Sequence, residues 1–161
     1  MSAEKIIPAV QPASINDLSA EIEAQVPFCD LDPLGVVWHG NYYKYFELAR
    51  TELMRSIGFD IEEMRNCGYV WPVAESSCRY ISPLRYGMRV VCRAVIMETE
   101  HRLKIAYRIT EKESGRLLAK GQTMQVAVKP GTWELCLASP EPLLNRVKAA
   151  LKKRKQWTEP A

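Results

Sequence analysis

The chain has 161 residues, of which 47% are hydrophobic and 25% charged, and its net charge is +3 at pH 7. These values are ordinary for one globular domain, and so mild a charge does not indicate nucleic acid as a partner, although it suits a small anionic ligand. The five cysteines are an odd number without a CxxC pair, which argues against a disulfide framework and against a zinc site. We expect a cytoplasmic protein without a membrane span, because no apolar run is long enough and the N-terminus lacks a signal-peptide pattern.

The N-terminal part of the chain divides into a leader and a strand. Residues 1–17 hold two prolines and no sustained hydrophobic period, so we expect a flexible leader followed by a single domain over residues 18–156. The stretch from Leu18 to Phe28 alternates apolar with polar residues, which is typical of a strand with one buried face.

A helix from Tyr42 to Ile57 is the expected centre of the domain. Its apolar residues occur at positions 42, 43, 45, 46, 48, 49, 53, 54 and 57, a wider distribution than the single stripe of a surface helix. Asn41 can cap its start, and Gly58 can end it. The helix would be about 25 Å long at the standard rise, so we expect a wrapping sheet or a partner subunit to cover it.

The second half of the chain has the pattern of antiparallel strands. A short helix, Phe59–Cys67 with Asp60 as its cap, precedes them. Strands are expected at Tyr69–Ser82, Arg89–Glu98, Leu103–Glu111 and Leu117–Lys129, with a short last strand at Trp133–Leu137 and a C-terminal helix at Pro140–Gln156. Because short turns join the strands, they must pair antiparallel. We therefore expect an α+β fold in which one antiparallel sheet wraps around the central helix.

Asp32 is the first candidate for chemistry. It lies just before Pro33 and Gly35, in the loop that leads into the central helix. A carboxylate in such a place can act as a general base on water or as a nucleophile. The alternative is an aspartate that only closes a turn, because Asp-Pro and Asp-x-x-Gly turns are common.

The start of the central helix, at His39, Gly40 and Asn41, is the second candidate. Its unpaired N–H groups and the positive end of the helix dipole can hold a carbonyl oxygen as that oxygen gains charge. Gly40 would let a ligand approach the backbone closely. The His39 ring can orient a substrate, or it can be hydrogen-bonded to nearby backbone.

Other charged residues have ordinary alternatives. Glu47 and Arg50 are spaced to form an ion pair on the helix surface, although Glu47 is also a possible catalytic carboxylate. Basic side chains can bind phosphates or remain solvated, and they are Arg79, Arg85, Arg89, Arg102, Lys104 and the run Lys152–Lys155.

The stretch FCDLDPLGVVWHGNY, from Phe28 to Tyr42, resembles the hotdog-fold acyl-CoA thioesterases of the 4-hydroxybenzoyl-CoA thioesterase type. The shared pattern is Asp-x-Asp-x-x-Gly-x-Val, an aromatic-His pair, Asn-Tyr and then Glu-x-Ala-Arg, and the resemblance extends from about Ile22 to Val128. Two residues depart from it: Trp38 stands where Tyr is usual, and Gly40 where Ala or Pro is usual. Both departures bear on the shape of the acyl pocket.

The resemblance implies a hotdog fold and a homodimer or homotetramer with active sites at the dimer interface. It implies that Asp32 is the catalytic carboxylate and that backbone N–H groups near His39 and Gly40 polarise the thioester carbonyl. It also implies that basic side chains hold the coenzyme A phosphates. The candidates for substrate contacts are Trp38, Asn41, Tyr42 and Arg85.

We therefore predict a thioesterase that hydrolyses an acyl- or aroyl-coenzyme A, or an acyl group on acyl carrier protein, without a metal or a cofactor. Asp32 would activate water, or attack the thioester to form an anhydride. Two alternatives stay open. One is a non-catalytic acyl-thioester-binding protein of the same fold, and the other is a hydratase or dehydratase that uses Asp32 and His39 as an acid–base pair.

Overall fold

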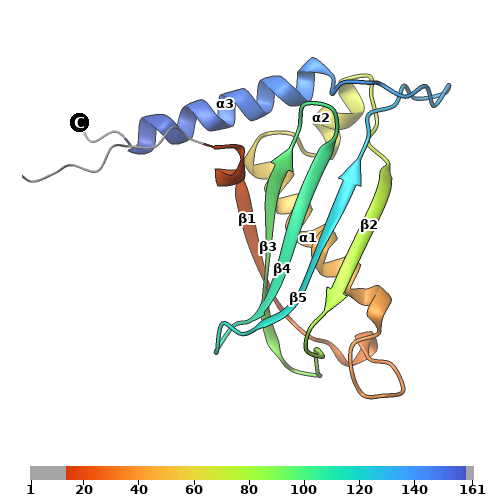
Figure 1. Ribbon diagram of the computed structural model, residues 1–161, viewed down its shortest axis with the longest axis vertical. Helices are drawn as coiled ribbons and strands as arrows, with labels where there is room; N and C mark the ends of the chain where they lie inside the picture. The colour runs from red at the N-terminus through yellow and green to blue at the C-terminus, as the bar shows by residue number, and fades with distance from the viewer. Residues whose placement is uncertain (1–13, 159–161) are drawn as a thin grey trace, which may run out of the picture.

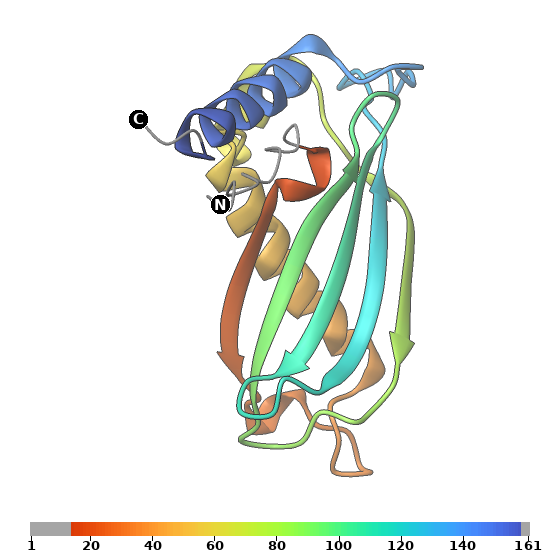
Figure 2. The ribbon, with the colours of Figure 1, turned by 60° about the vertical axis from the view of Figure 1, so that its left-hand side comes forward.

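The computed structural model describes residues 14–158, which form one antiparallel sheet and its helices (Figure 1). The strands lie in the order β1-β3-β4-β5-β2, so β1 and β2 are the two edges. The elements are β1 (Ser19–Gln25), α1 (Tyr42–Ser56), α2 (Ile61–Asn66), β2 (Val73–Tyr80), β3 (Arg89–Glu98), β4 (Leu103–Glu111), β5 (Leu117–Gln125) and α3 (Glu141–Thr158). The sheet curves along α1, and α3 lies across one end of the molecule (Figure 2). The predicted α+β architecture is therefore confirmed.

The core lies between α1 and the inner face of the sheet, because each turns its apolar residues toward the other. Phe46 and Leu53 of α1 are fully buried, and every second residue of β4 is buried on the facing side. The ring of Phe46 stacks on Tyr107 with 4.6 Å between centroids. Gly121 on β5 permits this approach, since a Cβ at that position would lie 2.5 Å from the Phe46 ring.

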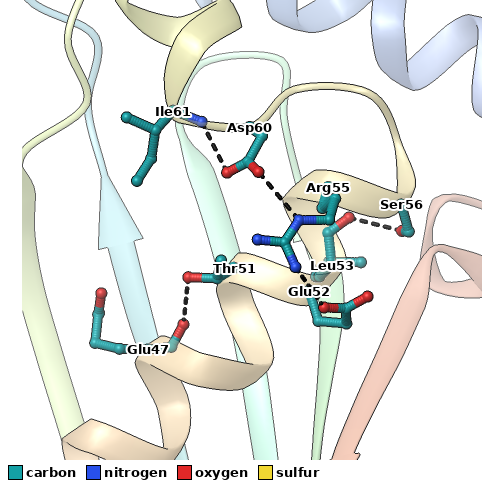
Figure 3. A network of polar contacts seen from close by, with 8 residues as sticks. All are labelled: Glu47, Thr51, Glu52, Leu53, Arg55, Ser56, Asp60 and Ile61. Carbon is teal, nitrogen blue, oxygen red and sulfur yellow. Dashed lines mark hydrogen bonds and ion pairs between the residues drawn. The ribbon is translucent and has the colours of Figure 1, made fainter.

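A polar network joins the end of α1 to α2 (Figure 3). Gly58 ends α1 as predicted, with a φ of +70° that residues with a side chain rarely adopt. Asp60 caps α2 as predicted, because one of its oxygens accepts a hydrogen bond from the Ile61 N–H at 2.8 Å. The other oxygen accepts one from Arg55, which also pairs with Glu52. The hydrogen bond from the Ile61 N–H, followed by that from Arg55, lowers the pKa of Asp60, so the carboxylate stays ionised.

The predicted cap of α1 is wrong. α1 begins at Tyr42 as expected, but a 3-10 turn, η3 (His39–Asn41), leads directly into it. Asn41 already has helical backbone angles, and its side chain makes no capping hydrogen bond. A capping residue needs an extended backbone, so the Asn41 amide instead donates to the backbone oxygen of Asp30 at 3.0 Å.

The bounds of β3 and β4 are confirmed to the residue, whereas β1, β2 and β5 are shorter than predicted. Pro72 has no N–H to donate, so regular pairing of β2 begins only after it. Val70 and Val128 keep a single bridge beyond that point. The irregular segment belongs to the connection into the edge strand rather than to the sheet.

The predicted last strand at Trp133–Leu137 is also wrong. Trp133 has a φ of 59°, and its N–H donates to the Lys129 oxygen at 3.0 Å to close a turn. Only one bridge, between Val128 and Leu135, remains there. A residue with positive φ cannot continue a strand, so the chain folds back at this point.

The two ends of the described chain meet near α3. Residues 1–13 of the predicted leader lie outside the described residues, and Ser14 opens a short 3-10 turn, η1 (Ile15–Asp17), through a capping box with Asp17. The C-terminal helix is confirmed, with Leu143 and Val147 of its predicted apolar face buried. Among residues 14–158, no helix is both long and apolar enough to cross a membrane.

Candidate active site

A pocket of about 270 Å³ lies beside the start of α1. The loop that precedes α1 lies at the end of the molecule opposite to α3 (Figure 1). The pocket is lined by Asp32, Val36, Val37, His39, Tyr42, Tyr80, Ile81, Ser82 and Pro83. Three predicted site residues, Asp32, His39 and Tyr42, thus line one pocket.

Asp32 sits in a tight turn that holds one of its carboxylate oxygens. Oδ1 accepts a hydrogen bond from the Leu34 N–H at 2.8 Å, and the backbone oxygen of Asp32 accepts one from Gly35 at 3.0 Å. The turn-closing alternative therefore describes the local geometry correctly. Within residues 14–158, the second carboxylate oxygen has no hydrogen-bond partner, so the turn orients the carboxylate and leaves one oxygen available at a pocket residue.

The N-terminal end of α1 reaches the same pocket through η3. The N–H of Asn41 donates to the Trp38 oxygen at 2.8 Å, whereas those of His39 and Gly40 stand at the first two positions, where a helix has no acceptor of its own. The hydroxyl of Tyr80 donates to the backbone oxygen of His39 at 3.0 Å, which ties this turn to β2. The start of the helix is thus held in place from two sides.

Two side chains of this helix start have distinct environments. Within the described residues the His39 ring makes no hydrogen bond, and it lies against the rings of Trp38 and Tyr80 with 4.9 and 6.5 Å between centroids. Tyr42 is buried, and its hydroxyl accepts a hydrogen bond from the Leu84 N–H at 3.2 Å. Burial raises the pKa of Tyr42, so this wall of the pocket carries no charge.

Asp30, the first aspartate of the motif, anchors the loop beside the pocket, although the sequence did not single it out. Asp30 is only 3% exposed, and its carboxylate accepts hydrogen bonds from the Tyr45 hydroxyl at 2.7 Å and from Lys44. Its backbone oxygen accepts from the Trp38 N–H at 2.9 Å and from Asn41. Asp30 therefore ties the loop to α1. Burial of Tyr45, followed by the hydrogen bond from its hydroxyl to the Asp30 carboxylate, raises the pKa of Tyr45. No local signal marks the role, because the partners of the carboxylate lie 14 and 15 residues later.

Trp38 and Gly40, the two residues that depart from the family pattern, lie against each other. The half-exposed indole of Trp38 lies over Gly40, so that a Cβ built on Gly40 would be 2.2 Å from the ring. Real Cβ contacts are never so short, and Trp38 in this position therefore requires glycine two residues later. The two departures are one structural change.

We predict that Gly40→Ala destabilises the protein by about 0.5–1.5 kcal/mol, the cost of forcing the indole off its rotamer. In a Trp38→Ala background the same change should be neutral or stabilising, because Gly40 has no positive φ and alanine restricts the unfolded chain. Urea unfolding of the two single variants and the double variant measures this coupling. Equal effects of Gly40→Ala in both backgrounds would contradict the contact.

The remaining predicted residues lie outside the pocket. Trp38, Gly40 and Asn41 adjoin it without lining it, and Arg85 is exposed in the turn before β3, so their contacts with substrate stay predictions. The ion pair between Glu47 and Arg50 is confirmed, and Glu47 does not line the pocket.

Comparison with known proteins identifies related sequences. A family model described as the thioesterase-like superfamily matches residues 26–151. The chain is 34% identical to a Synechocystis protein named "Putative esterase", over 68% of this chain and 67% of that protein. It is 35% identical to the Bacillus subtilis "Putative acyl-CoA thioesterase YneP", over 43% of this chain and 50% of that protein. It is 34% identical to the Arabidopsis thaliana acyl-acyl carrier protein thioesterase ATL3, over 49% of this chain and 42% of that protein. The chain thus spans half or less of the last two.

Solved structures share the fold. A 1,4-dihydroxy-2-naphthoyl-CoA thioesterase from Synechocystis superimposes with a TM-score of 0.72 at 23% identity, over 81% of this chain and 96% of that one. A 4-hydroxybenzoyl-CoA thioesterase bound to 4-hydroxybenzoyl-CoA gives a TM-score of 0.71 at 16% identity, over 81% and 99% of the two chains. At such low identity the likeness establishes the fold, and the predicted hotdog architecture is confirmed.

Proposed function

Because the chain belongs to the thioesterase-like superfamily, we propose that it hydrolyses an acyl- or aroyl-thioester to the free acid and a thiol. The observation that carries this proposal is the shared pocket of Asp32 and the start of α1. A carboxylate with one unpaired oxygen and a helix N-terminus supply the two things that thioester hydrolysis needs, a base or nucleophile and a place for negative charge.

Asp32 would act on one side of the thioester. As a base, its unpaired oxygen would take a proton from water while the water oxygen attacks the carbonyl carbon. As a nucleophile, it would form an acyl-aspartyl anhydride, expel the thiolate and be released by water. The hydrogen bond from Leu34 to Oδ1 would hold the carboxylate in one orientation for either route.

The start of α1 would act on the other side. As the carbonyl carbon becomes tetrahedral, its oxygen gains charge, and the N–H groups of His39 and Gly40 together with the dipole of the 15-residue α1 would stabilise it. Tyr80, through its hydrogen bond to the His39 oxygen, would keep these donors fixed. The same groups would serve coenzyme A and acyl carrier protein thioesters alike, since both carry the same reacting atoms.

The alternatives fit less well. A hydratase or dehydratase needs a coupled acid–base pair, yet Asp32 and His39 line one pocket without a hydrogen bond between them. A non-catalytic binding protein has no need of a carboxylate beside an electrophilic carbonyl. Release of free thiol, detected with a thiol-reactive dye, separates hydrolysis from both alternatives.

We predict a higher kcat/KM for benzoyl- or short acyl-CoA than for palmitoyl-CoA. The pocket of about 270 Å³ is at the small end of ligand pockets, which span about 300–1,000 Å³. Trp38, a predicted substrate contact, does not line this pocket, so the prediction rests on pocket size alone. Competition kinetics with paired substrates measure the preference, and a clear preference for palmitoyl-CoA would contradict it.

We also propose that two copies pair through β2 to form a homodimer, the assembly that the family resemblance implies. Every residue of β2 is exposed or half-exposed, and within residues 14–158 no strand pairs with its outer edge, an arrangement that natural sheets avoid. In an antiparallel pair, the start of one β2 lies beside the end of the other. The second copy would then cover Val73, Tyr80 and Ile81, which are 45–46% exposed, and border the pocket.

Sedimentation equilibrium at micromolar concentration should therefore show a dimer or a tetramer. The double variant Ser76→Lys/Ser77→Lys should shift the protein toward monomer, because a two-fold axis near the centre of β2 would bring the added charges together. The control Ser114→Lys/Thr132→Lys changes exposed turn residues and should leave the mass unchanged. A monomeric wild-type protein would contradict the dimer.

A further inference from the structure

Three basic side chains form a row across the outer face of the sheet. Arg108 on β4 pairs in register with Lys120 on β5, and Lys120 pairs with Arg79 on β2. All three are exposed, because alternate residues of these strands point away from α1. Neighbouring strands are about 4.8 Å apart, so the row is about 10 Å long.

Within residues 14–158 the charge of the row is not neutralised. Among residues 14–158 no carboxylate forms an ion pair with Arg79, Arg108 or Lys120, whereas the next cation across the sheet, Arg93, pairs with Glu21 at 3.6 Å. Like charges placed directly opposite each other destabilise a sheet. Because no carboxylate among the described residues offsets this repulsion, we expect an anionic partner outside the protomer.

The surface beside the row favours a helix over a compact phosphate. A groove of about 400 Å³ lies over the same three strands, and the residues that line it include Ala106 and Ser77, whose side chains are short. The strand N–H groups between β4, β5 and β2 are used in the ladder, so the face has no amide nest of the type that binds phosphates. One helical turn rises 5.4 Å, close to the spacing of the cations. Carboxylates at every third or fourth position of a helix would therefore meet the three cations in turn.

From the match between the rise of one helical turn and the spacing of the row, we propose that the row Arg79–Lys120–Arg108 is the docking surface for an acidic helix of an acyl carrier protein. This carrier would deliver the acyl thioester. This inference rests on the proposed thioesterase activity and names the substrate's carrier. Arg79 adjoins Tyr80, whose side chain lines the pocket on the other face of β2, so the docked carrier would lie next to the reaction site. A second copy of this chain fits the surface poorly, because a two-fold contact would set one cation row against another.

The test compares two triple variants with the same change in net charge. The row variant is Arg79→Gln/Lys120→Gln/Arg108→Gln. The control is Lys112→Gln/Arg116→Gln/Lys129→Gln, whose cations are exposed and ion-paired with Glu23, Glu111 and Glu134. Hydrolysis is measured on acyl carrier protein and on coenzyme A carrying the same acyl group, and binding of the carrier protein is measured at low and at high salt.

The row variant should lose about 10-fold or more in kcat/KM for the acyl carrier protein substrate and most of the salt dependence of binding, as for the loss of electrostatic steering. Its kcat/KM for acyl-CoA should fall far less than its kcat/KM for the acyl carrier protein substrate, because Arg79 is only one of several candidate contacts of the coenzyme A phosphates. Both activities of the control should not change. Equal losses on both substrates, equal behaviour of the two variants, or a changed sedimentation mass of the row variant would each overturn the proposal. If the wild-type protein hydrolyses neither thioester, the proposed function fails, and the binding comparison alone then decides whether this surface docks the carrier.

Discussion

Asp32→Asn is expected to lower kcat by about 10²–10⁴-fold, the usual contribution of a catalytic base or nucleophile, with substrate binding largely kept. Asparagine retains an oxygen that can accept the Leu34 N–H, so the turn should persist. It removes the negative charge and the basicity that either route of hydrolysis needs. Steady-state kinetics on the preferred thioester, with KM read separately from kcat, measure the effect.

Two controls make this result specific to Asp32. Thermal unfolding should show that Asp32→Asn is folded like the wild type. Glu47→Gln removes a carboxylate that pairs with Arg50 outside the pocket, and it should leave kcat nearly unchanged. Turnover of Asp32→Asn within a few-fold of wild type would reduce Asp32 to a turn residue, and a larger loss in Glu47→Gln would transfer the catalytic role to Glu47.

Asp30→Ala is expected to destabilise the protein by about 2–4 kcal/mol. The substitution leaves the buried Tyr45 hydroxyl without its hydrogen-bond acceptor. Lys44 adds less to this cost, since its side chain is 46% exposed and regains water. Urea unfolding measures the change. Activity should fall as well, because the loop that carries the pocket loses its attachment to α1.

The two aspartates of the motif can be told apart by comparing stability with activity. Asp30→Ala should lower the free energy of unfolding far more than Asp32→Asn does, and Asp32→Asn should lower kcat far more than its effect on folding explains. Asp30→Asn keeps an acceptor for Tyr45 and should cost less than Asp30→Ala. An Asp30→Ala protein as stable as wild type but inactive would show that Asp30, and not only Asp32, takes part in the reaction.

Elements whose burial repeats regularly could be predicted from the amino-acid sequence alone. The Val- and Ile-rich run Arg89–Glu98 predicted β3 to the residue, and the alternation over Leu103–Glu111 predicted β4, because successive side chains of a strand point to opposite faces of the sheet. The broad apolar surface of the central helix predicted that a sheet or a partner subunit would cover it, and the sheet does so. The uninterrupted motif from Phe28 to Tyr42 identified the family and led to Asp32, because the order of residues in one loop is itself the signal.

The contacts between residues that are distant in the sequence could not be predicted without the folded structure. Periodicity says whether a side chain is buried but not what lies opposite, so the attachment of Asp30 to Tyr45 could not be predicted. The covering of Gly40 by the Trp38 indole depends on a side-chain rotamer that no pattern records. The row of Arg79, Lys120 and Arg108 depends on strand register. The turns and the packing of the whole sheet set this register, and a shift of one residue would change the partner of every residue in the strand.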